Sequence, residues 1–266
     1  MERRKRSRSV KKKIAAAAYF CGIVTAMAAV GAIQLLHCMV STGKAIQSAL
    51  PTGDILPQHS AAITPLPSIY PAASGYLVIV NFDNPTGDER PEGLVCVTSV
   101  FGDEVVLQNE NSSVNSEAGR AASEMFKAAS AQGMSKYKIT SAYRSTAYQQ
   151  TLWEERLKTE PNYGSDPYNN PVKVMPGGMS EHATGLAMDI LSVAHDRADD
   201  AYGETQEGRW LAQNAHKYGF ILRYPKDKEH ITGVIYEPWH FRYVGKKAAG
   251  EIYKQGICLE EYLGKV

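Results

Sequence analysis

Two short stretches of the sequence carry imidazole and carboxylate groups at spacings that suit metal chemistry. In the first (SEHATGLAMD), His182 precedes Asp189 by seven residues, and in the second (EPWH), Glu237 precedes His240 by three. Zinc binds histidine nitrogen and aspartate oxygen readily, and three protein ligands leave the fourth tetrahedral position for water. A divalent ion lowers the pKa of such a water, and a nearby carboxylate such as Glu237 can take up its proton.

Each stretch alone also has an ordinary structural interpretation. A hydrogen-bonded pair inside the fold would explain His182 and Asp189. A surface ion pair with Arg242 or Lys246 would explain Glu237. Two histidines, an aspartate and a further glutamate are together more informative than either stretch. We therefore expect metal ligation and keep structural pairing as the alternative.

A third stretch (SAYRSTAYQQ) places a cation where an expected strand passes into an expected helix. The cation is Arg144, and Gln149 follows five residues later. A planar, permanently charged guanidinium at such a junction can point at a carboxylate or at a developing oxyanion. The alternative interpretation is an exposed arginine in a salt bridge.

Hydrophobic periodicity predicts the elements that must position these residues. Small and apolar residues recur at helical spacing over 116–132, and alternation over 186–190 puts Asp189 on the face opposite Met188 and Ile190. Because helices and strands interleave without regular βαβ spacing, we expect an α+β domain with a small antiparallel sheet flanked by helices. Further strands are expected over 76–80, 137–142, 220–224 and 239–244, and short irregular strands within 93–107. Further helices are expected over 145–158 and 209–218, and a long functional loop over 159–179.

The N-terminal part of the chain predicts a membrane anchor. Residues 3–13 hold eight Lys and Arg, and 14–36 carry no formal charge. Such an apolar run, of about 23 residues, is long enough to span a bilayer as a single transmembrane helix. The cations predict an N-terminus in the cytoplasm and a domain outside it, with a cleaved signal peptide as the alternative. We expect a basic tail (1–13), an anchor (14–36), an extracytoplasmic linker (37–75) and a catalytic domain (76–266).

Composition narrows the partners that the chain can have. The 266 residues carry a net charge of +1, so the chain as a whole has no basic excess suited to nucleic acid, and we expect no such partner. Beyond the apolar run and its end, the exported part keeps Cys96 and Cys258. They either pair in an oxidising compartment or stay as two buried thiols. The sequence leaves the oligomeric state open.

The three stretches occur in order with two more, WLAQNAHKYGFILRYP and ITGVIYEPWHFRYVG. Together they resemble the VanY-type D-alanyl-D-alanine carboxypeptidases, within the wider group that includes lysostaphin-like enzymes and Hedgehog domains. The resemblance runs from about residue 76 to about residue 254. The Ser-x-His-x-x-Gly-x-Ala-x-Asp and Glu-x-x-His elements are highly specific in combination, whereas either alone is not.

The resemblance implies a role for each residue of the three stretches. It makes His182, Asp189 and His240 the ligands of one zinc ion. It makes Glu237 the catalytic base. Arg144 would polarise the scissile carbonyl and stabilise the tetrahedral intermediate. The fold that it implies is a small antiparallel sheet flanked by helices.

The resemblance also implies the substrate, which is the stem peptide of peptidoglycan. The enzyme would remove its C-terminal D-alanine, with Gln149 and Ser180 holding the peptide and Ser180 near the terminal carboxylate. Alternatives are cleavage of an L,D bond, action on a dipeptide, or a non-catalytic zinc-containing module that binds the wall. The chain departs from many relatives at Ala183, where they carry Gln or His, and this affects substrate preference more than the metal.

Overall fold

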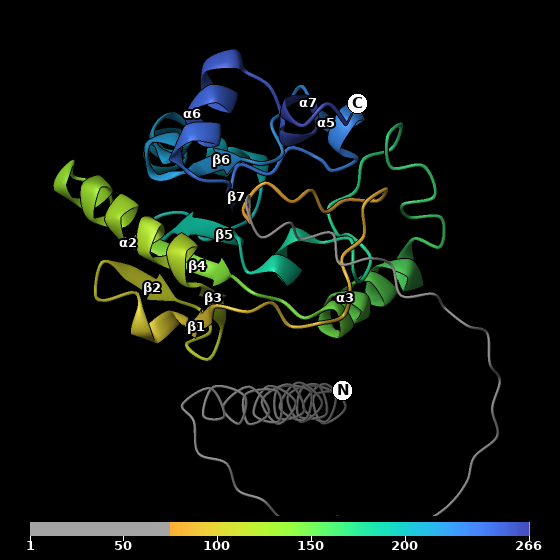
Figure 1. The fold of residues 1–266 in the computed structure, drawn as a ribbon, viewed down its shortest axis with the longest axis horizontal. Coiled ribbons are helices and arrows are strands. Elements are labelled where there is room, and N and C mark those ends of the chain that lie inside the picture. The colour runs from red at the N-terminus through yellow and green to blue at the C-terminus, as the bar shows by residue number, and fades with distance from the viewer. Residues whose placement is uncertain (1–74, 266) are drawn as a thin grey trace, which may run out of the picture. The chain divides into compact units, whose positions relative to one another are not determined.

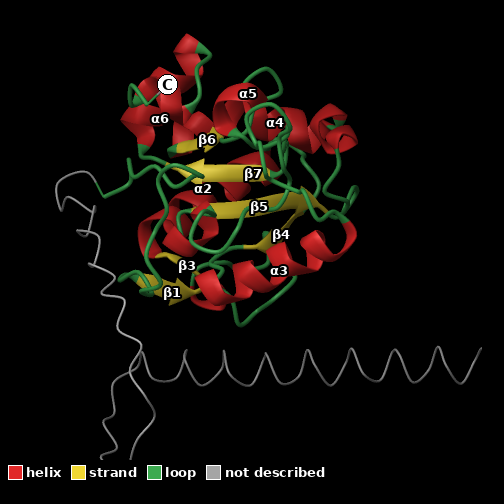
Figure 2. Cartoon of the chain, turned by 90° about the vertical axis from the view of Figure 1, so that its right-hand side faces the viewer, coloured by secondary structure: helices red, strands yellow, loops and turns green. Residues whose placement is uncertain are grey.

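A five-stranded sheet, with strand order β2-β4-β5-β7-β6, carries Asp189 and His240, two of the residues singled out above (Figures 1 and 2). The computed structural model describes residues 75–265. The strands of this sheet are β2 (Val105–Leu107), β4 (Tyr137–Ser141), β5 (Ala187–Ser192), β7 (His240–Tyr243) and β6 (Phe220–Leu222). A separate antiparallel ribbon consists of β1 (Leu94–Cys96) and β3 (Ser113–Asn115).

Helices lie on both sides of the sheet. Figure 2 shows α3 on the near side of the strands and α2 on the far side. Asn115 caps α2 by accepting hydrogen bonds from the Glu117 and Ala118 amides, and Ser145 caps α3 by accepting one from the Tyr148 amide. The α-helices are α2 (Ser116–Ala131), α3 (Thr146–Thr159), α4 (Gln206–Asn214), α5 (Glu229–Thr232), α6 (Lys246–Gln255) and α7 (Leu259–Tyr262). The 3₁₀ helices are η1 (Val97–Ser99), η2 (Glu181–Thr184), η3 (Asp200–Glu204) and η4 (Ala215–Tyr218).

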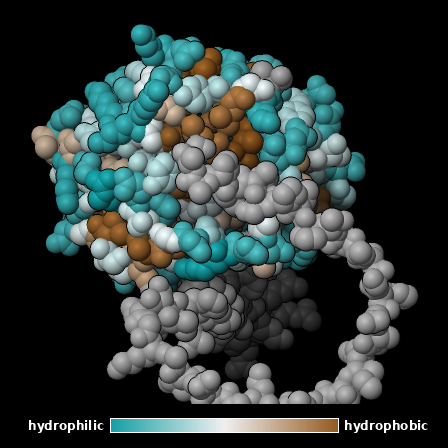
Figure 3. Space-filling view, in the orientation of Figure 1, coloured by the Kyte–Doolittle hydropathy of each residue, from teal (hydrophilic) through white to brown (hydrophobic). Residues whose placement is uncertain are grey.

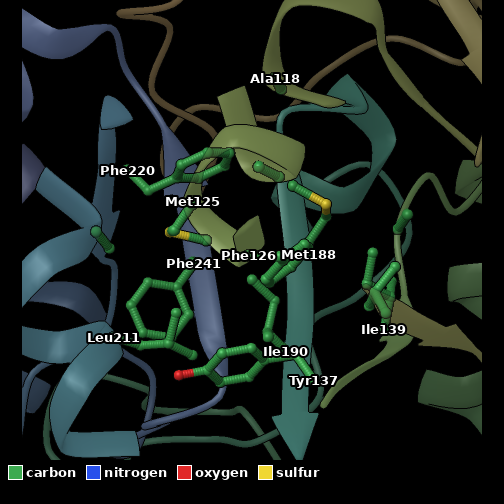
Figure 4. Close-up of a cluster of buried hydrophobic side chains, with 14 of the residues drawn as sticks. Ala118, Met125, Phe126, Tyr137, Ile139, Met188, Ile190, Leu211, Phe220 and Phe241 are labelled. Atoms are coloured by element: carbon green, nitrogen blue, oxygen red, sulfur yellow. The ribbon is translucent and has the colours of Figure 1, made fainter. Parts of the chain in front are cut away.

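The main hydrophobic core packs on one face of the sheet. Met188, Ile190 and Phe241 project from β5 and β7 toward Met125 and Phe126 of α2, and none of the five is more than 1% exposed (Figure 4). Burying side chains of this size stabilises the fold by about 1.5–3 kcal/mol each. Because side chains alternate along a strand, this packing turns the intervening residues of β5 and β7 to the opposite face.

The expected α+β domain with helices around a sheet is confirmed, but the sheet is mixed. β4–β5, β5–β7 and β7–β6 pair antiparallel, as expected, whereas β2 pairs parallel to β4. Parallel neighbours need a crossover of a dozen or more residues, and β3 and α2 supply it between β2 and β4. The sequence gives no sign of this crossover because β2 is only three residues long.

The prediction of a strand over 76–80 is wrong, because these residues form no strand in the structure. The carbonyls of Tyr76 and Val78 accept hydrogen bonds from Nη2 of Arg242, at 3.1 and 2.6 Å, so a side chain takes the place of a neighbouring strand. Cys258 is a free, buried thiol and therefore does not pair with Cys96.

Most of the expected N-terminal segments lie outside the described residues, namely the tail (1–13), the anchor (14–36) and nearly all of the linker (37–75). Within 75–265, no helix is both long enough and apolar enough to cross a bilayer. Hydrophilic residues cover much of the domain face visible in Figure 3.

Candidate active site

The pairing of two central strands brings together the first two residues of the site. β5 and β7 run antiparallel with Asp189 directly opposite His240. Directly opposed residues have Cβ atoms about 4.5–5.5 Å apart, so their side chains meet. Nδ1 of His240 lies 3.2 Å from Oδ1 of Asp189. Both side chains project from the face opposite Met188 and Phe241.

A tight turn brings in the second imidazole. His182 lies in η2, and Gly185, which directly follows this helix, has a left-handed φ of 69°. Only glycine adopts this conformation easily, and a Cβ at this position would lie 2.3 Å from Cδ2 of Leu94. The turn sends the chain directly into β5, so Nε2 of His182 lies 3.3 Å from Oδ2 of Asp189. The centroids of the His182 and His240 rings are 4.9 Å apart.

The hydrogen bonds of the site suit a cation. Nδ1 of His182 lies 2.7 Å from the Ala142 carbonyl, which can only accept, so this nitrogen carries the hydrogen and Nε2 keeps its lone pair. Nε2 of His182 and Oδ1 of Asp189 are buried and have no hydrogen-bond partner among the described residues. Leaving such atoms unsatisfied costs about 1–3 kcal/mol each. A bound cation would satisfy both.

The three side chains form a group that fits one divalent ion. His182, Asp189 and His240 each offer a ligand atom, and these atoms lie within 4.8 Å of one another. Two imidazoles and one carboxylate suit zinc, and a set of three is typical of catalytic sites that keep one position open. The structure therefore brings together all three residues that the sequence predicted as ligands. Their metal-binding role remains a prediction.

Opposite charges and burial shift the pKa values inside this group. Burial alone would raise the pKa of Asp189, but the two imidazoles hold it well below its usual value. Burial and the charge of Arg144 lower the pKa of His182. Burial would also lower the pKa of His240, but the carboxylates of Asp189 and Glu181 outweigh it and raise that pKa to about 9. A cation bound at Nδ1 would displace this proton, because ligating histidine is neutral.

Glu237 lies beside the group and not on the surface. It is only 5% exposed, and its Oε2 is 3.5 Å from Nδ1 of His240. The surface ion pair considered from the sequence is absent, because Arg242 and Lys246 pair with other glutamates. Burial raises the pKa of Glu237 to about 8, against the opposing charge of His240. A buried carboxyl of this kind can both accept and return a proton.

The remaining predicted residues line the same cavity of about 160 Å³, next to the histidines. Arg144 donates its backbone N–H to the His182 carbonyl, and its Nε is buried without a hydrogen-bond partner in the described part of the chain. Gln149 donates to the Met175 carbonyl at 2.6 Å, which leaves its Oε1 without a partner there. Ser180 is 5% exposed. Arg144 and Gln149 thus present unsatisfied polar atoms that a ligand could meet.

Other cavity residues were not identified from the sequence as site residues. Tyr224, Trp239 and Lys173 also line the cavity. The ammonium of Lys173 lies 4.6 Å from the Trp239 ring centroid and donates to the Ala198 carbonyl. Lys173 falls in the segment 159–179, which was expected to be a functional loop. No spacing in the sequence distinguishes it from the other lysines.

The sequence comparisons place the chain among D-alanyl-D-alanine carboxypeptidases of the VanY family. A family model described as VanY, D-alanyl-D-alanine carboxypeptidase, matches residues 111–246. The chain is 41% identical to a putative carboxypeptidase, YodJ of Bacillus subtilis, over 68% of this chain and 63% of the relative. It is 42% identical to a D-alanyl-D-alanine carboxypeptidase of Enterococcus faecalis over 53% of this chain and 52% of the relative. The chain thus spans less than two thirds of either relative's length.

Solved structures with related sequences share the fold. The LdcB LD-carboxypeptidase matches with a TM-score of 0.63 and 38% identity, over 73% of this chain and 87% of LdcB. A mutant of the vancomycin-resistance D,D-pentapeptidase VanY, in complex with Zn(II), matches with a TM-score of 0.55 and 35% identity. That match covers 71% of this chain and 98% of the VanY chain.

Replacing His240 with Ala should abolish zinc binding, because it removes one of three ligands. Zinc at 100 times its dissociation constant should stabilise the wild-type protein by about 2.7 kcal/mol. That corresponds to a rise of roughly 5–10 °C in melting temperature for a domain of this size. Thermal unfolding with and without zinc measures the shift. His230→Ala, at an exposed position of α5, is the matched control and should keep the zinc-induced shift. A zinc shift that survives in His240→Ala would refute the ligand assignment.

Proposed function

The chain belongs to the VanY family of D-alanyl-D-alanine carboxypeptidases, and from this premise we propose that it is a zinc-dependent D,D-carboxypeptidase. Its substrate would be the stem peptide of peptidoglycan, from which it removes the C-terminal D-alanine. One arrangement carries the proposal: a three-ligand group, His182, Asp189 and His240, beside the buried carboxyl of Glu237 in one cavity. A structural zinc site would normally fill all four positions with protein ligands.

The residues around the three predicted ligands would each have a separate role in peptide hydrolysis. A bound zinc ion would supply Lewis acidity, which activates water at neutral pH and polarises the scissile carbonyl. Glu237 takes the proton from the attacking water at its carboxylate and passes it to the leaving amine of D-alanine. Arg144 lines the same cavity, and its Nε is buried without a hydrogen-bond partner in the described part of the chain. Its guanidinium would donate to the oxygen that gains charge in the tetrahedral intermediate.

The cavity favours a short terminal residue. Its volume of about 160 Å³ is below the range of roughly 300–1,000 Å³ typical of sites for drug-sized ligands. Ser180 would bind the terminal carboxylate of the peptide, and Oε1 of Gln149 would accept a hydrogen bond from a peptide N–H. The cavity wall would thus offer one polar contact to the carboxylate of a terminal alanine and one to a peptide N–H.

An L,D-carboxypeptidase is the second candidate. The likeness to the LdcB LD-carboxypeptidase, at 38% identity and a TM-score of 0.63, favours it. The same ligands and base would serve either bond, because the chemistry at the carbonyl is identical. The stereochemistry of the residue before the scissile bond separates the two.

We also propose that the enzyme works on the outer side of a membrane to which its N-terminus is anchored. The basic segment 3–13 followed by the uncharged run 14–36 supports this arrangement. It would place the domain in the compartment that holds its proposed substrate.

Defined peptides distinguish the two bond preferences. We expect the purified full-length protein with zinc to shorten a stem pentapeptide by one alanine and to leave the tetrapeptide product intact. Mass spectrometry of the products measures this directly, and D-alanyl-D-alanine alone tests dipeptidase action. A higher kcat/KM on the tetrapeptide would replace the D,D proposal with the L,D one.

Replacing Glu237 with Gln should lower kcat by about 10²–10⁴-fold, because the amide keeps the size of the side chain but cannot take up a proton. Zinc content, measured by metal analysis, should stay at the wild-type level. Glu154→Gln, at an exposed position of α3, is the control and should leave both kcat and zinc content unchanged. Turnover within a few-fold of wild type in Glu237→Gln would contradict the assigned base.

Protease added to intact protoplasts that express the full chain tests the proposed topology. The domain should be digested from outside while a cytoplasmic marker protein survives. Immunoblotting before and after lysis follows both proteins. Protection of the domain until lysis would contradict an extracytoplasmic location.

A further inference from the structure

Two buried polar atoms face each other behind the metal group. Oε2 of Glu181 lies 3.7 Å from Nε2 of His240, on the side of the ring away from Asp189. Neither atom has a hydrogen-bond partner within residues 75–265. The separation is longer than a hydrogen bond, for which N–H···O distances are about 2.9 Å. One of the two atoms can donate and the other can accept, so a small movement would join them in a hydrogen bond.

The carboxylate of Glu181 is held firmly from its other side. Glu181 is fully buried, and its Oε1 accepts from Nε of Arg223 at 2.8 Å and from Nη1 of Arg242 at 2.7 Å. Hydrogen bonds between ionised groups are short and strong, so two on one oxygen fix the plane of the carboxylate. Oε2 is thereby aimed at His240.

A second buried carboxylate balances the charge. Glu260 of α7 accepts from both terminal nitrogens of Arg223, at 2.8 and 2.6 Å. Two glutamates and two arginines therefore form a buried quartet, here named the Glu–Arg quartet (Glu181, Glu260, Arg223 and Arg242), with no net charge. Because the arginines are already paired, the carboxylate of Glu181 can sit beside a metal ligand without leaving an unpaired charge in the interior.

We propose that Glu181 is a positioning residue that accepts a hydrogen bond from Nε2–H of His240 and so holds Nδ1 toward the metal. This inference rests on the proposed function, because it takes His240 as a zinc ligand. A ligating imidazole has one ring hydrogen, and a carboxylate that accepts it fixes both the tautomer and the orientation of the ring. Closing the pair requires a movement of about 0.8 Å, from the present distance to that of a normal hydrogen bond.

The decisive variant is Glu181→Gln. The two guanidinium groups can only donate, so the Gln carbonyl will turn to them and its NH₂ will face Nε2–H of His240. Two hydrogen-bond donors, the new amide and Nε2–H of His240, would then face each other, and the proposed hydrogen bond could not form. We expect zinc affinity, measured by competition with a chelator, to fall about 10–100-fold. The visible spectrum of the Co²⁺-substituted protein should also change, because the ligand geometry is less well defined.

Glu260→Gln is the matched control. It removes the other carboxylate of the Glu–Arg quartet and loosens the same arginine, but it does not face the imidazole. Its zinc affinity should stay within about threefold of wild type even where its melting temperature falls as far as that of Glu181→Gln. Equal zinc losses in the two variants would reduce Glu181 to a structural role and overturn the proposal, as would wild-type affinity in Glu181→Gln.

A second variant and a measurement on the unaltered protein cover the case in which Glu181→Gln does not fold. Glu181→Asp keeps the charge for the arginines but withdraws the carboxylate from His240, so it should still weaken zinc binding. In the zinc-loaded wild type, ¹H–¹⁵N NMR should find the ring hydrogen of His240 on Nε2, and a hydrogen on Nδ1 would overturn the proposal. Failure of the wild type to bind zinc would instead sink the proposed function itself.

Discussion

The register between β5 and β7 is the constraint on which the site depends. Asp189 lies opposite His240 because Met188 lies opposite Phe241 on the other face, where both are fully buried. A slip by one residue would send every side chain of a strand to the other face. Such a slip of β5 would put the carboxylate of Asp189 into the core and turn Met188 and Ile190 toward the cavity. The hydrophobic core therefore fixes the chemistry on the opposite side of the sheet.

A second constraint comes from buried charge. The Glu–Arg quartet draws on η2, the residue after β6, β7 and α7, so it ties four separate segments together behind the imidazoles. Arg242 also donates to the Tyr76 and Val78 carbonyls, and Asn81 donates to Glu260 at 3.4 Å. Buried ion pairs add little net stability, since desolvation offsets their attraction. In this domain their contacts join η2, β7 and α7 behind the imidazoles.

The sequence revealed the site better than it revealed the scaffold. Alternation alone put Asp189 on a strand with an apolar reverse face, and the family's motifs supplied His182, His240 and Glu237. These are local patterns. Long-range pairing leaves no local trace, so strands were expected within 93–107 but the parallel pairing of β2 with β4 was not. Helices α6 and α7 were not predicted either. The segment 76–80 has the composition of a strand, yet it is bound by an arginine far along the chain.

The neighbouring residues Glu181 and His182 show why part of the site was missed. In a 3₁₀ helix with three residues per turn, successive side chains point about 120° apart. The side chain of His182 therefore reaches Asp189 at the metal group, while that of Glu181 passes behind His240. Spacing rules search for residues that share a face, so they select His182 and pass over Glu181. Two adjacent side chains thus approach the metal group from opposite sides, and a single short turn sets the relation between both imidazoles.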